Sequence, residues 1–162
     1  DWEEEKKWQY KKLENASNSD VFTWTIELKE DNSIIGQISF HNLEREEEKD
    51  IGWFLDPSYQ KKGYAYEAAS EVLKYMFLEV GIERISTCVS LNNPNSYKLM
   101  ERLGFKRQST KRKIKYTFLE KEEECTDYIL EKNDFLKEYF RKDHLYIKTD
   151  ILFNYIFIKF DF

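Results

Sequence analysis

Residues 51–81 constrain the fold of this chain more than any other stretch, because they read as a strand, a loop and a helix in succession. Residues 51–55 form a short apolar run. Asp56-Pro57 ends it, because proline lacks the backbone N–H that hydrogen-bonds to a neighbouring strand. Apolar residues then recur at helical spacing over 65–80, and Gly81 stands where a left-handed helix end is expected. The stretch therefore predicts a strand–loop–helix unit.

The loop of this unit, Gln60-Lys61-Lys62-Gly63-Tyr64-Ala65, suits an anion. Glycine and a small residue at the start of a helix let the backbone approach a ligand, and the unpaired N–H groups of the first turn attract phosphate. The spacing differs from the glycine fingerprints of dinucleotide and P-loop sites. Taken alone, the loop is equally consistent with an ordinary strand-to-helix turn that carries two solvated lysines.

Two blocks of the sequence resemble one family. The pattern Gln60-x-x-Gly63-x-Ala65 resembles the pyrophosphate loop of the GCN5-related N-acetyltransferases, and residues 51–68 are similar to the branch that acetylates the N-terminal alanine of ribosomal proteins. Residues 93–105, in which Asn-Pro-Asn-Ser runs into Leu-Gly-Phe, are similar to the Asn-x-x-Ser segment of that branch. The resemblance covers roughly residues 20–134.

The expected fold class is α/β: a strongly twisted mixed sheet with helices on both faces and a central parallel pair of strands, 51–55 and 84–90. Residues 21–28 and 33–41 alternate as two strands of a hairpin, and Gly36 marks a bulge in the second. A helix should begin at Pro94, with Asn93 as its cap, and end before Gly104.

The resemblance implies that coenzyme A lies between the two parallel strands. Backbone N–H groups around 61–65 would hold its pyrophosphate, one near Phe54 would polarise the thioester carbonyl, and Asn93 would bind the pantetheine arm. The implied coenzyme-binding residues are Phe54, Leu55, Gln60, Lys61, Lys62, Gly63, Tyr64, Ala65, Asn93 and Ser96.

The reaction also needs a proton donor and a base. Many relatives carry a tyrosine seven residues after the asparagine, where this chain has Met100, so the resemblance passes the role of donor to Ser96. Ser96 is equally well read as a first-turn serine that caps its own helix. His41, Glu44 and Asp127 are candidate bases, and proton removal through water is an alternative. No spacing of histidines and cysteines indicates a metal site.

The expected activity is transfer of acetyl from acetyl-CoA to a primary amine, on a protein N-terminus or a small molecule. The alternatives are a non-catalytic acyl-CoA-binding module and an RNA-binding domain that uses the basic residues of 106–115. A solvated hairpin with opposite charges facing across its strands is the simpler reading of that basic stretch.

Composition limits the classes of partner and the cellular compartments that we expect for this chain. The net charge of −5 argues against general nucleic-acid binding, and two cysteines, Cys88 and Cys125, are too few for a disulfide framework. The chain has no run of some 18 apolar residues and no signal-peptide pattern, which favours a cytoplasmic protein that does not insert into membranes.

The two ends depart from the family. Residues 1–134 are expected to form the acetyltransferase domain without the family's usual first strand, and residues 2–14 suit a partly exposed helix. Residues 135–162 have no recognised counterpart. Their β-prone part, 151–160, is predicted to add to a sheet edge, within its own chain or across a two-fold dimer. The other reading is an artefactual tail with little order.

Overall fold

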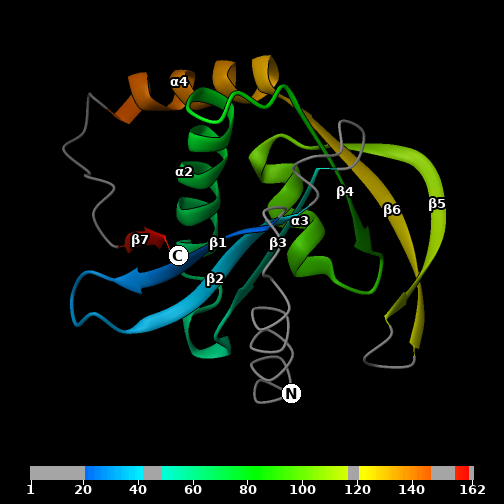
Figure 1. Cartoon of the computed structure of the whole chain (residues 1–162), viewed down its shortest axis with the longest axis horizontal. Helices are drawn as coiled ribbons and strands as arrows, with labels where there is room; N and C mark the ends of the chain where they lie inside the picture. Colours follow the sequence, from blue (N-terminus) through cyan, green and yellow to red (C-terminus); the bar gives the residue numbers. More distant parts are fainter. Residues whose placement is uncertain (1–20, 42–48, 117–120, 147–155, 161–162) are drawn as a thin grey trace.

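The computed structural model describes residues 21–41, 49–116, 121–146 and 156–160 (Figure 1). The predicted helix over 2–14 and the candidate base Glu44 lie outside these ranges. In chain order the elements are β1 (Val21–Leu28), β2 (Ile34–His41), β3 (Asp50–Leu55), the 3-10 turn η1 (Pro57–Tyr59), α2 (Tyr64–Leu78), β4 (Arg84–Ser90), α3 (Pro94–Leu103), β5 (Lys106–Tyr116), β6 (Lys121–Glu131), α4 (Lys132–Tyr146) and β7 (Ile156–Phe160).

The strands form two antiparallel sheets, sheet A in the order β3-β2-β1-β7 and sheet B in the order β4-β6-β5. The predicted α/β class is confirmed. The prediction of a single sheet, with 51–55 and 84–90 as its central parallel pair, is wrong, because β3 and β4 belong to different sheets. Figure 1 shows them running in the same general direction and moving apart. They meet near the start of β3, where the Ser86 N–H donates to the Lys49 carbonyl at 3.1 Å.

The predicted hairpin of β1 and β2 is confirmed, and so is its bulge. The register pairs Ile26 with Gly36 and Glu27 with Ile34, so Ile35 is the extra residue. Glycine is required beside the bulge, because a Cβ on Gly36 would lie 2.4 Å from the carbonyl oxygen of Phe54. The bulged strand β2 therefore passes unusually close to the end of β3.

Helix α2 packs its apolar stripe against the sheets, as its spacing predicts. The stripe comprises Ala68, Ala69, Val72, Leu73, Met76 and Phe77, all almost fully buried. Opposite it, Trp24 of β1 is 1% exposed and meets the ring of Tyr75 edge-on, with the centroids 6.3 Å apart. The chain leaves α2 through Gly81, whose φ of +81° is the predicted left-handed conformation. This packing holds α2 against sheet A.

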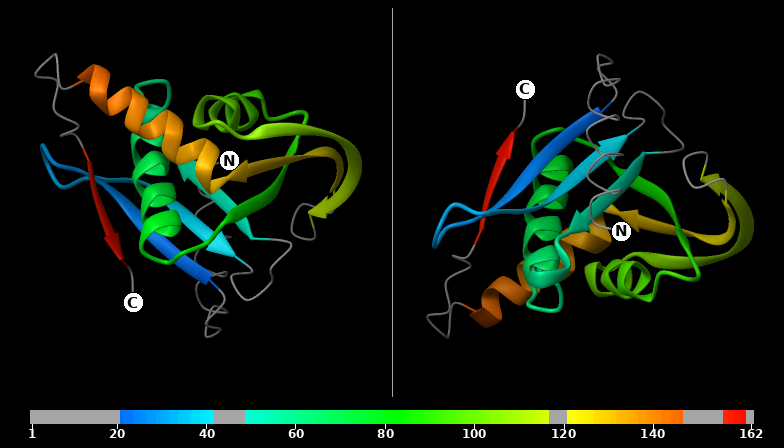
Figure 2. Two further views of the ribbon diagram at one scale, coloured as in Figure 1. Left: turned by 90° about the horizontal axis from the view of Figure 1, so that it is seen from above. Right: turned by 90° about the horizontal axis from the view of Figure 1, so that it is seen from below.

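Helix α4 was not predicted from the sequence, and Figure 2 shows it crossing α2. Phe135 of α4 is buried against Phe77 with ring centroids 5.4 Å apart, and the hydroxyl of Tyr139 donates to Glu71 Oε1 at 2.5 Å. The expected domain boundary after residue 134 falls inside this helix. The first part of the segment 135–162 is therefore packed on the core of the same domain.

Strand β7 lies antiparallel to β1, with Trp24 opposite Phe160 and Leu28 opposite Ile156. The predicted strand addition is confirmed for 156–160, and the pairing is within the chain; residues 151–155 lie outside the described ranges. Among the described residues, no helix is long and apolar enough to cross a membrane.

Candidate active site

The loop after β3 is tightly folded. The Asp56 side chain accepts a hydrogen bond from the Ser58 N–H at 2.8 Å, which starts η1. The Gln60 amide then donates to the Leu55 carbonyl at 3.0 Å and ties the loop back to the strand end. Two residues of the loop have left-handed backbone, Lys61 with φ +62° and Gly63 with φ +93°. Glycine adopts this conformation readily, whereas for Lys61 it has a free-energy cost, and such non-glycine residues concentrate at functional sites.

The N-terminus of α2 is open. Gly63 is the N-cap residue, and no side chain caps the helix. The first-turn N–H groups have no partner within a helix, so they and the helix dipole attract an anion. A Cβ built on Gly63 meets nothing within 4 Å, so space lies in front of this residue. Such an uncapped helix start is chemically suited to an anion that accepts hydrogen bonds from the backbone.

Helix α3 forms the opposite wall. Its cap is the predicted one: Pro94 is the first residue, and Asn93 Oδ1 accepts from the Ser96 N–H at 3.1 Å. The Asn93 amide nitrogen is not used by this cap. Met100, which occupies the position of the family's tyrosine, is 3% exposed and does not line the site. The Ser96 hydroxyl makes no hydrogen bond to other residues in the described part of the chain, so it does not cap its own helix.

A cavity of about 560 Å³ lies between the end of β3, the loop, the first turn of α2 and α3. It brings together all the predicted site residues except Lys62 and His41. Strand β4 contributes no lining residue; the wall expected from it comes from α3 instead. The lining residues are Trp53, Phe54, Leu55, Pro57, Gln60, Lys61, Gly63, Tyr64, Ala65, Tyr66, Asn93, Asn95, Ser96, Lys98, Leu99 and Arg102.

The cavity has a basic side that the sequence analysis missed. Lys98 and Arg102 of α3 face it together with Lys61, and the Arg102 guanidinium lies over the Tyr66 ring, 4.0 Å from its centroid. Lys98, Leu99 and Arg102 stand three, four and seven residues after Asn95, so helical periodicity was the available signal. Lys62 instead lies 5.3 Å from the centroid of Tyr59, outside the cavity lining.

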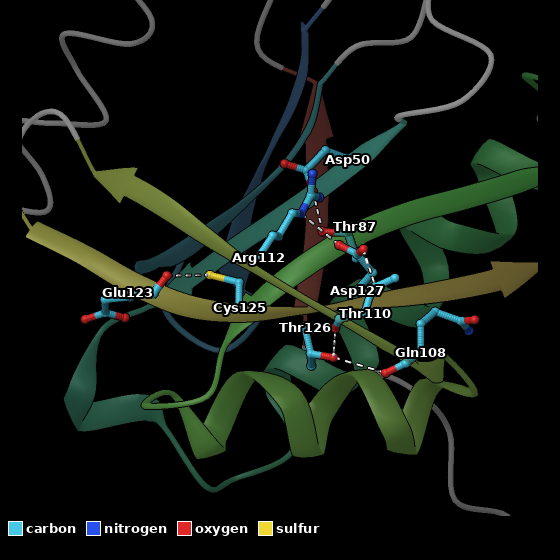
Figure 3. A network of polar contacts seen from close by, with 9 residues as sticks. All are labelled: Asp50, Thr87, Gln108, Thr110, Arg112, Glu123, Cys125, Thr126 and Asp127. Carbon is cyan, nitrogen blue, oxygen red and sulfur yellow. Dashed lines mark hydrogen bonds and ion pairs between the residues drawn. The ribbon is translucent and has the colours of Figure 1, made fainter.

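Neither described candidate base lines the cavity. His41 is the last residue of β2, and its Nε2 lies 2.9 Å from the Ser39 hydroxyl. Asp127 faces two partners, since Arg112 Nε lies 2.9 Å from its Oδ1 and the Thr110 hydroxyl donates to its Oδ2 at 2.7 Å (Figure 3). Asp127 is therefore engaged within sheet B by Arg112 and Thr110, and it is not among the residues that line the cavity.

Comparison with known proteins agrees with this geometry. The family model described as "Acetyltransferase (GNAT) domain" matches residues 1–106, which is more than half of the chain. The chain therefore belongs to the GNAT acetyltransferase family, whose general reaction is the transfer of an acetyl group from acetyl-CoA to an amine.

The uncharacterized N-acetyltransferase YnaD of Bacillus subtilis is 42% identical over 82 residues, which cover 50% of this chain and 48% of that protein. A GNAT-family acetyltransferase structure from Bacillus anthracis is 31% identical, with a TM-score of 0.59 over 68% of this chain and 66% of that one. The ribosomal-protein-S5-alanine acetyltransferase of Vibrio fischeri is 25% identical, with a TM-score of 0.63 over 78% and 69%. The chain spans about half the length of the curated relatives it matches.

Proposed function

We propose that this chain is an N-acetyltransferase that transfers the acetyl group of acetyl-CoA to a primary amine. One observation carries the proposal: the uncapped N-terminus of α2, headed by Gly63, opens into a cavity whose far wall presents Asn93 and Ser96. Membership in the GNAT family supports it.

The residues present fit coenzyme A. The first-turn N–H groups of α2 suit the pyrophosphate, and the lack of a Cβ on Gly63 leaves room for it. Lys61, Lys98 and Arg102 add positive charge for a ligand that carries several phosphate charges. The unused amide nitrogen of Asn93 is placed to donate to the carbonyls of the pantetheine arm.

In this reaction the C–N bond forms on the amine, the C–S bond of the thioester breaks, and the sulfur leaves as a thiolate that takes up a proton. We assign the donor role to Ser96, because its hydroxyl lines the cavity without a hydrogen-bond partner in the described part of the chain. We assign to a backbone N–H near Phe54 the hydrogen bond to the thioester carbonyl oxygen. This donor stabilises the transition state because negative charge develops on that oxygen.

The proton released by the attacking amine also needs an acceptor. His41, the last residue of β2, stays a candidate to take the ammonium proton; because it does not line the cavity, this role requires the amine to approach past the end of β2. Water-mediated proton removal needs no such approach.

The acceptor is proposed to be a protein N-terminus or a small-molecule amine. Similarity to the ribosomal-protein-S5-alanine acetyltransferase of Vibrio fischeri supports the first. A cytoplasmic location is part of the proposal, since Cys88 and Cys125 are both free thiols. Strand β7 pairs with β1 of its own chain, so residues 156–160 give no argument for a homodimer formed by strand addition.

Two measurements test the proposal: calorimetry with acetyl-CoA, and thiol release from acetyl-CoA with a panel of peptide and small-molecule amines. Binding followed by amine-dependent thiol release is the expected result. Binding without turnover on any amine would favour the acyl-CoA-binding module. RNA binding that weakens with salt, without coenzyme affinity, would reject the proposal. The register of β5 and β6, with Lys113 opposite Glu124, already supports the reading of 106–115 as a hairpin with opposed charges.

A further inference from the structure

In the described part of the chain, strand β3 of sheet A and strand β4 of sheet B are joined at the start of β3, at the opposite end of that strand from the cavity. Strands β3 and β4 share no ladder, but the Ser86 N–H donates to the Lys49 carbonyl, and next to it the Thr87 hydroxyl donates to Asp50 Oδ1. Asp50 is the first residue of β3, and Leu55, its last, lines the cavity. The strands therefore meet at the start of β3 and are apart where the coenzyme is proposed to bind.

The side chains at this junction are enclosed. Thr87 is 2% exposed and Asp50 is half-buried. Burial raises the pKa of the neighbouring Cys88 thiol to about 11; the Arg112 guanidinium opposes this shift and the Asp50 carboxylate adds to it. Charges from both sheets thus act on one thiol. Figure 3 shows Asp50, Thr87, Arg112 and Asp127 gathered at this place.

A small change at the junction is amplified at the site. Asp50 and Leu55 are five residues apart, or about 16 Å in an extended strand, so a rotation of about 5° at the junction moves Leu55 by more than about 1 Å. The opposite wall of the cavity begins at Asn93, three residues after β4 ends. The junction is therefore the point from which the two walls diverge.

We propose that Thr87 and Asp50 are positioning residues that hold β3 against β4 and so set the width of the coenzyme site. The inference rests on the proposed function. Without the hydroxyl of Thr87, the half-buried carboxylate of Asp50 loses a donor and recruits water, which separates the two strands. Neither residue lines the cavity, so neither touches the coenzyme directly.

The test compares three variants of the full chain: Thr87→Val, Thr87→Ser, and Thr126→Val as a matched control. Thr126 is 1% exposed, and its hydroxyl faces the carbonyls of Gln108 and Thr110 at 3.2 and 2.9 Å, wholly within sheet B. Both valine variants lose a buried hydroxyl, so both should melt earlier. Only Thr87→Val should weaken coenzyme A binding, by roughly tenfold or more, while Thr87→Ser should bind within about threefold of wild type.

A second readout does not use the coenzyme. Amide hydrogen exchange at Ser86, whose N–H bonds to Lys49, should accelerate in Thr87→Val and stay unchanged in Thr126→Val. If Thr87→Val does not fold, Asp50→Ala removes the same bond from the less buried side and should show the same two effects.

The outcomes are separable. If wild type binds coenzyme A and Thr87→Val binds it equally well, or if Thr126→Val weakens binding as much, the inference is overturned and the proposed function stands. If wild type itself binds no coenzyme A, the proposed function fails and this inference fails with it.

Discussion

The guanidinium of Arg102 lies over the aromatic ring of Tyr66, with its Cζ 4.0 Å from the ring centroid. Arg102 is an exposed residue of α3, and Tyr66 belongs to the first turn of α2, so the contact joins the two helices beside the cavity. A stacked guanidinium keeps its donors in plane and free to bind phosphate, and its position is already restricted before the ligand arrives.

Replacing Arg102 by alanine should therefore weaken coenzyme A binding by about tenfold, the usual size of one charge-assisted hydrogen bond. Calorimetry on the purified variant measures the effect. Arg141→Ala is the control, because Arg141 is an exposed residue of α4 that pairs with Glu138 outside the cavity. Equal affinity in the Arg102 and Arg141 variants would show that the basic side of the cavity does not hold the ligand.

Ser96→Ala should lower turnover by roughly ten- to a thousandfold, the range expected for one acid–base group, with little change in coenzyme affinity. The reason is that Ser96 is assigned to the leaving thiolate and not to the phosphates. The measurement is single-turnover thiol release with a saturating amine. Ser58→Ala is a control, since only the backbone of Ser58 is bonded to Asp56. An unchanged rate when chemistry limits turnover would remove Ser96 from the mechanism.

The loop and the cap of α3 were predictable because local rules determine them. Asn93 is the N-cap of helix α3, Pro94 is its first residue and Gly104 ends it, and each residue type is preferred at that position. The helix therefore runs between them as predicted. Gly63 was recognisable for the same reason: a short glycine-headed turn before an amphipathic helix admits few conformations.

The rest depends on contacts between distant residues. Strands β3 and β4 separate after Lys49 and Ser86 because β3 pairs with β2 and β4 pairs with β6. No local sequence pattern predicts these pairings. Arg102 enters the site only because α3 packs beside α2. Helix α4 was not predicted, although Phe135, Leu136, Tyr139 and Phe140 recur at helical spacing and were a usable signal for it.

The thiol of Cys88 should react slowly with iodoacetamide. Burial raises its pKa to about 11, and a raised pKa lowers the thiolate fraction at any pH below it. At pH 8 the fraction is roughly two hundredfold lower than for a thiol with a pKa of about 8.5. In a Cys125→Ser background the alkylation rate should rise about tenfold per pH unit between pH 7 and 10. A rate that levels off near pH 9 would contradict the enclosed environment described for Cys88.

Deleting residues 147–162 should lower the melting temperature, because β7 covers the edge of β1 and its removal exposes unpaired backbone groups there. The deletion leaves the described part of α4 intact, so Phe135 and Tyr139 keep their contacts with α2. Differential scanning calorimetry and mass in solution are the measurements. If the shortened chain melts no earlier and keeps its oligomeric state, the tail has no structural role.

The central claim is that the backbone at the start of α2 binds the pyrophosphate of coenzyme A. Gly63 and Gly81 provide a matched pair, since each lies at one end of α2 with φ of +93° and +81°, and a Cβ on either meets nothing within 4 Å. Valine at either position should destabilise the fold by a similar amount, about 1–2 kcal/mol, because both backbones are left-handed.

The decisive measurement is the dissociation constant for coenzyme A in wild type, Gly63→Val and Gly81→Val, taken at a temperature where all three are folded. We predict that Gly63→Val weakens binding by at least about tenfold, because its side chain projects where the phosphates must approach the helix. Gly81→Val should bind as wild type does. Equal affinity in all three proteins would contradict the assignment of this helix terminus as the coenzyme site.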